Sequence, residues 1–288
     1  MKIIVITGQT ATGKTNYAAE LAKKHHGELI NADSRQIYKK LDIITGKDYP
    51  PGIRIHLYDI VNPNEYFSSF DYVQRALPLI KKMLARDTTP VIGGGTYLYI
   101  KHLLYNVETE NIPPDWQLRK ELENKTVSEL QSILTSINNL AIQQLNNSER
   151  NNPQRLIRKI EIAKVRSMPI NPTLTITLPR KLGEHNLNIE FIGLRFNDKK
   201  ILKAKIIARV EDRLKSGAID EVKKLLAAGY TENDPGLKTI GYQQLIKHLK
   251  GDLSKEQAIK QWIFKELQYA KRQYTFMKKD PNLVWKTV

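Results

Sequence analysis

The chain has 288 residues, and 46 Lys and Arg against 30 Asp and Glu give it a formal net charge of +16. Its hydrophobic fraction of 41% can bury a core, which excludes a wholly disordered or collagen-like chain. The absence of Cys excludes disulfides, Cys zinc sites and thiol nucleophiles, and the six His show no metal-ligand spacing. The sequence has no run of 18 apolar residues and no signal-peptide pattern, so we expect a cytoplasmic protein without a membrane partner.

The positive charge is concentrated in the second half of the chain. Residues 1–150 carry 18 Lys and Arg and 16 Asp and Glu, whereas residues 151–288 carry 28 and 14. The net charges are therefore +2 and +14. This asymmetry indicates an anionic partner, and we favour nucleic acid over the alternative of an ordinary solvated surface.

Strand and helix patterns alternate over the first 105 residues. The strand patterns cover residues 2–7, 28–32 and 90–92, and the helix patterns cover residues 14–24 and 70–86. The first strand pattern is rich in β-branched residues, as in strands that are buried on both faces of a parallel sheet. We therefore predict an α/β fold with a parallel sheet flanked by helices.

The segment GQTATGKT, from Gly8 to Thr15, matches the phosphate-binding pattern G-x-x-x-x-G-K-[ST]. It lies between a strand pattern and a helix pattern, which favours a true P-loop over a fortuitous Gly-rich turn. In such a loop the backbone N–H groups and Lys14 bind a diphosphate, and the Thr15 hydroxyl can bind Mg²⁺, the expected cofactor. The expected diphosphate ligands are Gly8, Thr10, Ala11, Thr12, Gly13, Lys14 and Thr15. The motif alone fits ATP as well as another diphosphate.

The second strand pattern runs into the segment ADSRQIY at residues 32–38. Its polar side chains follow the carboxyl end of a strand, where open α/β sheets bind ligands. We predict that Asp33 is a general base, and the alternative is that it only caps the next helix. The strand pattern at 90–92 leads into Gly93-Gly94-Gly95-Thr96 without the Asp that holds Mg²⁺ in many ATPases, which argues against a motor ATPase.

A different unit begins at residues 111–115 (NIPPD), where two prolines interrupt the chain. The residues after these prolines are polar and show helix patterns, and a Pro-punctuated stretch at 168–179 ends the unit. We interpret this unit as an inserted helical domain. Further helix patterns cover residues 116–123, 127–137, 154–166, 199–214, 218–228 and 254–278.

Six segments, and the order in which they occur along the chain, resemble those of the tRNA dimethylallyltransferases. They are GQTATGKT, ADSRQIY, GGGTYLY, PQRLIR, IGYQQ and AKRQYTFMK, and the resemblance extends over residues 2–278. It implies a P-loop α/β core with an inserted helical domain. We place the catalytic core at residues 1–112, an inserted tRNA-binding domain at 113–188, and a basic helical segment that rejoins the core at 189–288.

The resemblance also implies the reaction: transfer of a dimethylallyl group from its diphosphate to the exocyclic N6 of the adenosine just 3′ of the tRNA anticodon. Asp33 would be the base, and Thr96 would position the amine. The target base is stacked in the anticodon loop and must be flipped out. The residues implied to contact tRNA are Asp33, Ser34, Arg35, Gln36, Thr96, Arg119, Gln154, Arg155, Leu156, Ile157 and Arg158. The expected partners are tRNA and dimethylallyl diphosphate, and the expected state is a monomer.

Two rows of residues mark the last predicted helix at seven-residue intervals. We expect the aromatic row, Trp262, Tyr269 and Phe276, to lie in the core rather than to stack on bases. We expect the basic row, Lys265, Arg272 and Lys279, to face phosphate, with Arg272 among the tRNA contacts.

The sequence departs from the family pattern at Asn152, Gln243, His56 and Lys205. Lys205 replaces an Arg, so we expect Arg209, one turn later, to share in binding the diphosphate. Two other functions remain as alternatives. A small-molecule kinase would explain the P-loop but not the charge of residues 151–288, and a non-catalytic RNA-binding protein would explain the charge but not Asp33 beside a P-loop.

Overall fold

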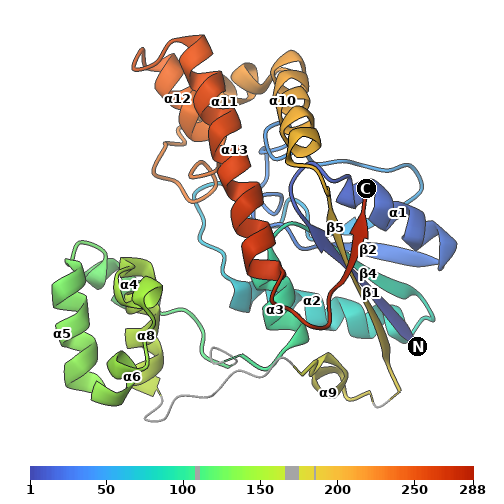
Figure 1. Ribbon diagram of the computed structural model, residues 1–288, viewed down its shortest axis with the longest axis horizontal. Coiled ribbons are helices and arrows are strands. Elements are labelled where there is room, and N and C mark those ends of the chain that lie inside the picture. Colours follow the sequence, from blue (N-terminus) through green and yellow to red (C-terminus); the bar gives the residue numbers. More distant parts are fainter. Residues whose placement is uncertain (108–110, 166–174, 185) are drawn as a thin grey trace.

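The computed structural model describes residues 1–107, 111–165, 175–184 and 186–288, and it contains a six-stranded parallel sheet (Figure 1). The strand order is β3-β2-β4-β1-β5-β6. The strands are β1 (Lys2–Gly8), β2 (Gly27–Asn31), β3 (Ile55–His56), β4 (Thr89–Gly93), β5 (Asn188–Arg195) and β6 (Val284–Thr287). Every pair of neighbouring strands is parallel, which confirms the predicted α/β class.

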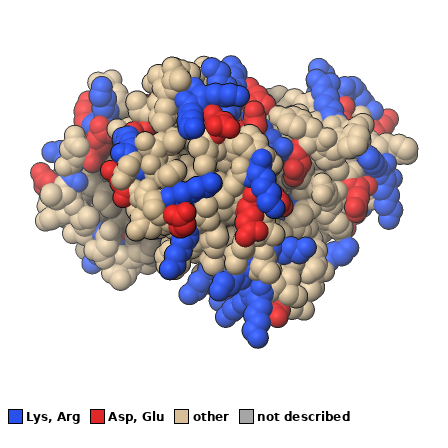
Figure 2. Space-filling view, turned by 90° about the horizontal axis from the view of Figure 1, so that it is seen from above, with Lys and Arg blue, Asp and Glu red and all other residues tan. Residues whose placement is uncertain are grey.

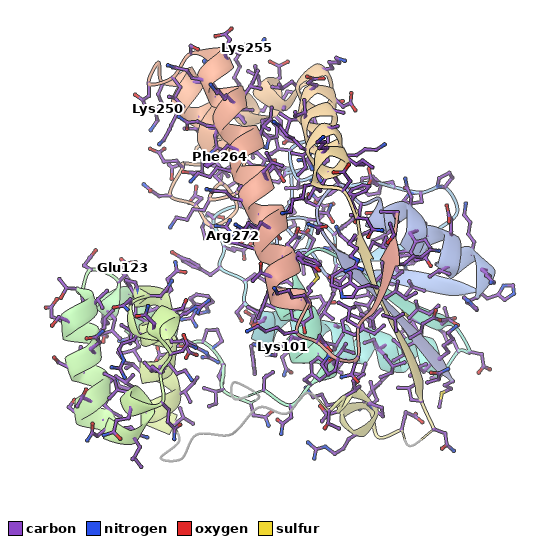
Figure 3. The ribbon with its side chains drawn as sticks, in the orientation of Figure 1. Lys101, Glu123, Lys250, Lys255, Phe264 and Arg272 are labelled. Atoms are coloured by element: carbon purple, nitrogen blue, oxygen red, sulfur yellow. The ribbon has the colours of Figure 1, made fainter. Side chains whose placement is uncertain are left out.

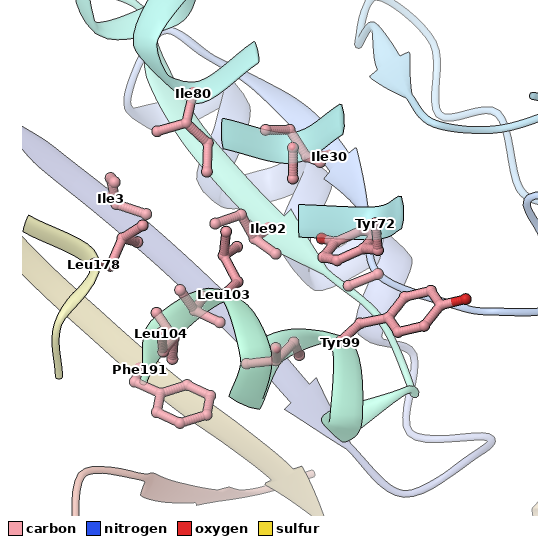
Figure 4. Packing of buried hydrophobic residues seen from close by; sticks show 14 of the residues in the cluster. Ile3, Ile30, Tyr72, Ile80, Ile92, Tyr99, Leu103, Leu104, Leu178 and Phe191 are labelled. Atoms are coloured by element: carbon pink, nitrogen blue, oxygen red, sulfur yellow. The ribbon is translucent and has the colours of Figure 1, made fainter. Parts of the chain in front are cut away.

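Helices cover both faces of the sheet, which explains why β1 is apolar from Ile3 to Ile6. Ile3 and Val5 point to the face covered by α2 (Ser69–Leu84) and α3 (Tyr97–Leu104) (Figure 4). Ile4 and Ile6 point to the opposite face, which α1 (Lys14–Lys24) covers. Successive residues of a strand face opposite sides of a sheet, so a strand buried on both sides needs a continuous apolar run.

The C-terminal part of the chain is not wholly helical, contrary to the prediction. β5 and β6 extend the sheet beside β1, and the helices of this part pack around Trp262, whose side chain is fully buried. These helices are α10 (Lys199–Lys215), α11 (Ala218–Ala227), α12 (Tyr242–Leu249) and α13 (Lys255–Met277). In Figure 1, α13 runs from this helical cluster down to α3 beside the sheet.

The predicted aromatic row of α13 is only partly correct. Trp262 is buried and Tyr269 is half-buried, but Phe276 is 48% exposed and contacts Tyr97 edge to face. The reason is geometric, because an α-helix has 3.6 residues per turn and a seven-residue repeat drifts around it. The side chains that α13 buries are Ala258, Trp262, Glu266, Ala270, Gln273 and Met277. The basic row is exposed, and its contact with phosphate remains a prediction.

The inserted helical unit has its own apolar core, made of residues between Leu118 and Ala163. It contains α4 (Trp116–Leu122), α5 (Val127–Ile137), α6 (Asn139–Gln143), α7 (Asn147–Arg150) and α8 (Pro153–Val165). In Figure 1 it stands apart from the sheet, at the left.

The unit that packs separately is shorter than the predicted 113–188. The next helix, α9 (Leu178–Leu182), packs with the sheet, because Leu178 and Leu182 belong to the core of α2 and α3. Most of the Pro-punctuated stretch predicted at 168–179 and the last residue of the helix predicted at 154–166 lie outside the described residues. Across the described ranges, no helix is both long and apolar enough to span a membrane.

Candidate functional site

A cavity of about 1040 Å³ opens at the carboxyl ends of β1, β2 and β4. Its walls come from the P-loop, the turn after β2, the Gly93–Thr96 turn, α10 and α13. This is the edge of the sheet at which the sequence predicts a ligand site. Parts of the chain that are more than 250 residues apart therefore line one cavity.

Contacts with Leu194 of β5 fix the start of the P-loop. Gly8 has φ 147°, and a Cβ atom there would lie 2.2 Å from the carbonyl oxygen of Leu194. The Gln9 N–H donates to that same oxygen at 3.2 Å. Inside the loop, the Thr12 hydroxyl donates to the Gln9 carbonyl at 2.8 Å. Only glycine fits at position 8, so the first Gly of the motif is needed for packing against β5.

Cationic groups converge on the P-loop side of the cavity. Lys14 Nζ donates to the Gln9 carbonyl at 2.6 Å. Burial, together with the nearby charge of Arg209, lowers the pKa of Lys14 to about 8. Arg209 Nη1 donates to Thr10 Oγ1 at 2.5 Å, so the predicted substitute for Lys205 reaches the P-loop, and Lys205 lines the same cavity.

Arg213 is a further cation of this cavity that the sequence analysis missed. It lies one turn after Arg209 on α10, is almost fully buried and pairs with Glu266 of α13 at 3.3 Å. Burial and the charge of Arg209 lower the pKa of Arg213 to about 9. Its four-residue spacing from Arg209 was the available signal, since residues i and i+4 share a helix face.

Asp33 begins a turn and does not cap a helix. Its Oδ1 accepts from the Arg35 N–H at 2.9 Å, and the residues after it form a turn. Among the described residues, no group donates to its Oδ2. A Cβ atom on Gly95 would lie 3.2 Å from this Oδ2 and 2.8 Å from Gln273 Nε2, so glycine lets these side chains approach the β4 turn. The structure therefore excludes the helix-cap alternative and leaves one carboxylate oxygen available.

Thr96 joins the end of β4 to the Asp33 turn. Its Oγ1 accepts from the Ser34 N–H at 2.9 Å and donates to Ser34 Oγ at 3.1 Å. Arg35 donates to the Pro235 carbonyl at 3.1 Å, and Gln36 donates to the Gly46 carbonyl at 2.7 Å. The predicted residues 33–36 and Thr96 therefore meet in one wall, where part of their hydrogen bonding stabilises the wall itself.

Gln273 is a second residue that the sequence analysis missed. It is 6% exposed, its Oε1 accepts from the Thr10 N–H at 2.8 Å, and its Nε2 donates to the Gly95 carbonyl at 2.9 Å. One amide thus connects the P-loop to the turn that carries Thr96. A search of α13 at helical spacing could have found Gln273, because it continues the buried stripe of Trp262 and Ala270.

The predicted tRNA contacts of the insert fall into three groups. Arg119 and Arg158 both bind the buried carboxylate of Glu161, with Arg119 Nε and Nη2 at 2.5 and 2.9 Å and Arg158 Nη1 at 2.7 Å. The side chains of Leu156 and Ile157 are buried in the core of the insert. Gln154 and Arg155 are exposed.

Basic side chains lie both at the cavity and on the surface away from it. Arg272 lines the cavity from α13 and is exposed (Figure 3). In the view of Figure 2, Lys and Arg side chains form several separate groups, with Asp and Glu between them. Phosphate contacts of an extended partner could therefore be distributed over several elements.

The fold and the cavity define a parallel α/β protein in which the P-loop motif and the carboxylate of Asp33 line one cavity. A family model described as IPP transferase matches residues 36–280. A tRNA dimethylallyltransferase of Endomicrobium trichonymphae is 36% identical over 293 residues, which cover 98% of this chain and 94% of that protein. The full-length tRNA isopentenylpyrophosphate transferase of Bacillus halodurans has a similar crystal structure, with a TM-score of 0.70, 32% identity, and coverage of 99% of this chain and 89% of that one.

A eukaryotic dimethylallyltransferase captured acting on tRNA is also similar, with a TM-score of 0.76, 25% identity, and coverage of 99% of this chain and 74% of that one. The chain belongs to the IPP transferase family. It is an enzyme with tRNA dimethylallyltransferase activity, as the order of its motifs predicted.

Proposed function

We propose that the cavity transfers the dimethylallyl group with Asp33 as the general base and the P-loop as the cradle of the leaving diphosphate. The observation that carries this proposal is that Asp33 and Lys14 line the same cavity, where a Cβ atom on Gly95 would lie 3.2 Å from Asp33 Oδ2 and 3.8 Å from Lys14 Cε. A carboxylate that accepts a proton and a cationic cradle for an anion are thus available to one substrate pair.

The chemistry needs both groups. The exocyclic amine of adenine is a weak nucleophile, because its lone pair is delocalised into the ring. As the new C–N bond forms and the C–O bond to diphosphate breaks, the N6 proton passes to Asp33. The negative charge that develops on the diphosphate is stabilised by the P-loop amides, Lys14 and Arg209. Thr96, at the end of β4, positions the amine beside Asp33.

Mg²⁺ is part of this proposal. Within the described part of the chain, no three His, Asp or Glu side chains could form a metal site by themselves. The cavity instead offers the hydroxyl of Thr15, and Mg²⁺ commonly takes one or two protein ligands and completes its shell with water and phosphate oxygens. The residues therefore fit Mg²⁺, which when bound would neutralise charge on the diphosphate.

The proposed RNA partner is the anticodon stem-loop of tRNA, bound by a monomer in the cytoplasm, where tRNA is found. Gln154 and Arg155 of α8 and Arg272 of α13 are the exposed candidates for contacts to it. A flipped adenosine would enter the cavity past residues 34–36. Arg119 and Arg158 are proposed to act mainly by keeping the insert folded, because Glu161 engages both.

The variant Asp33→Asn tests the base, because it keeps the shape of the side chain and removes the proton acceptor. We expect single-turnover transfer from labelled dimethylallyl diphosphate to fall by roughly 10²-fold or more, with both dissociation constants within a few-fold. Asp212→Asn changes the charge of the same cavity by the same amount and is expected to transfer normally. An undiminished rate in Asp33→Asn would exclude Asp33 as the base.

A further inference from the structure

Tyr66 and Trp116 form an exposed aromatic stack between the core and the insert. Their ring centroids are 4.8 Å apart and their planes are inclined by 27°. Tyr66 follows β3 in the core, whereas Trp116 is the first residue of α4 in the insert. Tyr66 is 57% exposed and Trp116 is 37% exposed, so a large part of this aromatic surface faces solvent.

The guanidinium of Arg119 in the insert also contacts the Trp116 ring. The guanidinium carbon of Arg119 lies 4.6 Å from the centroid of the Trp116 ring. Arg119 is held in turn by both oxygens of Glu161. Trp116 therefore contacts both a tyrosine of the core and an arginine whose position is set by a buried carboxylate. A surface preorganised in this way loses little side-chain entropy when a ligand stacks on it.

The core end of the stack is anchored near the catalytic cavity. Phe67, the residue after Tyr66, packs on Tyr99 with ring centroids 6.3 Å apart. Tyr99 lies on α3, one turn after Thr96, and Thr96 lines the cavity. Phe67 and Tyr99 therefore connect the Tyr66 end of the stack to the helix that begins at the cavity wall.

We propose that the Tyr66–Trp116 stack binds one unpaired base of the anticodon loop next to the adenosine that enters the cavity. This inference rests on the proposed function. When a base is flipped out of a loop, its neighbours lose stacking partners. Unpaired bases stack on aromatic rings, and this stacking does not depend on which base is present.

The test is a binding cycle between protein variants and abasic RNA. Anticodon stem-loops are prepared with an abasic site at each unpaired position in turn, except the target adenosine. Binding is measured by fluorescence anisotropy without dimethylallyl diphosphate, so no transfer takes place. With the natural protein, one abasic position is expected to weaken binding roughly 5- to 100-fold. With Tyr66→Leu, the same abasic position should change binding by less than about twofold, because the stacking partner is already gone.

Phe264→Leu is the matched control, because Phe264 is an aromatic residue of α13 with 56% exposure (Figure 3). It should respond to every abasic position like the natural protein. The fluorescence of Trp116 gives a second readout that does not require the Tyr66 variant, since Trp262 is fully buried and Trp285 lies on the edge strand β6. The natural stem-loop should quench the fluorescence of Trp116, whereas the stem-loop with the abasic site that weakens binding should not. Trp116→Phe should abolish this change in fluorescence.

Equal abasic effects in the natural protein and Tyr66→Leu, or unchanged Trp116 emission on binding, would overturn the stacking site and leave Tyr66–Trp116 as a contact between the core and the insert. Labelled transfer to the natural stem-loop is measured in parallel with the natural protein. Its absence would overturn the proposed function, so the two failures are distinguishable.

Discussion

Replacing Glu161 by Gln is expected to unfold the insert while leaving the catalytic cavity intact. The Glu161 side chain is 1% exposed, and it accepts from Arg119, from Arg158 and, at 3.1 Å, from the Asp115 N–H. Burial raises the pKa of Glu161, but the hydrogen bonds and charges of the two arginines outweigh burial, so the net pKa is lowered from 4.5. The carboxylate is therefore charged and paired at neutral pH.

The magnitude follows from this pairing. Removing one partner of a buried ion pair costs about 3–5 kcal/mol, and the remaining arginines, with side chains 29% and 20% exposed, would stay partly buried without their carboxylate. At about 0.05–0.15 kcal/mol per residue, a unit of roughly 50 residues such as the insert has only about 2.5–7.5 kcal/mol of stability. The variant should thus lose most of the stability of the insert. The same stabilisation should be complete above pH 4.5 in the natural protein and should disappear as the pH falls through the lowered pKa of Glu161.

Hydrogen exchange measures this outcome directly. Amides of α5 and α8 should lose protection in Glu161→Gln, whereas β1 and the affinity for dimethylallyl diphosphate should be unchanged and tRNA binding should be lost. Glu121→Gln, an exposed change in the same insert, is the matched control and should keep full protection. Natural protection of α8 in Glu161→Gln would refute the claim that this carboxylate holds the insert together.

Three other outcomes follow from the cavity and the insert. The affinity for dimethylallyl diphosphate, measured by calorimetry, should fall about tenfold per pH unit above pH 8, because Lys14 has a pKa of about 8 and must be charged to bind. Lys14→Arg should remove this pH dependence. The same pH dependence in Lys14→Arg would contradict the role of Lys14 in binding the diphosphate. Gln273→Ala should lower kcat roughly 10- to 100-fold while its tRNA affinity stays within a few-fold of that of the natural protein. Gln261→Ala, an exposed change on α13, should have the kinetics of the natural protein. Similar kinetics in both variants would argue against a positioning role for Gln273. Arg155→Ala should reduce the slope of log affinity against log salt by about 0.7–0.9 if Arg155 neutralises one phosphate, and an unchanged slope would make it an ordinary surface residue.

The P-loop and its surroundings could be predicted because their signals are local. Gly8 and Lys14 belong to one short motif, and the flanking strand and helix patterns are strong. Asp33 and Thr96 follow the ends of β2 and β4, and the ends of neighbouring parallel strands meet at one edge of a sheet. Knowledge of the fold class was therefore sufficient to bring these residues together.

For residues whose role depends on distant partners, helical spacing can indicate a shared or buried helix face but not what that face contacts. Gln273 and Arg213 act on the cavity from helices that are placed only by the packing of the whole C-terminal part. Glu161 looks like any charged residue of an amphipathic helix, and only the packing of α4 against α8 makes it a buried ion-pair partner. β6 is four residues long, and its strand character depends on the edge that β5 offers.

The two chain segments that enter and leave the insert meet at the core. Tyr105 and Ile176 form an antiparallel bridge, and the Thr177 N–H donates to the Leu104 carbonyl at 2.7 Å. The segment between these residues is therefore an insertion whose two ends are adjacent in the core. Domain insertions are tolerated at sites of this kind. A version of the enzyme in which a short turn replaces residues 107–175 should therefore retain the sheet and the P-loop. Diphosphate binding and RNA recognition could then be assigned to physically separable modules.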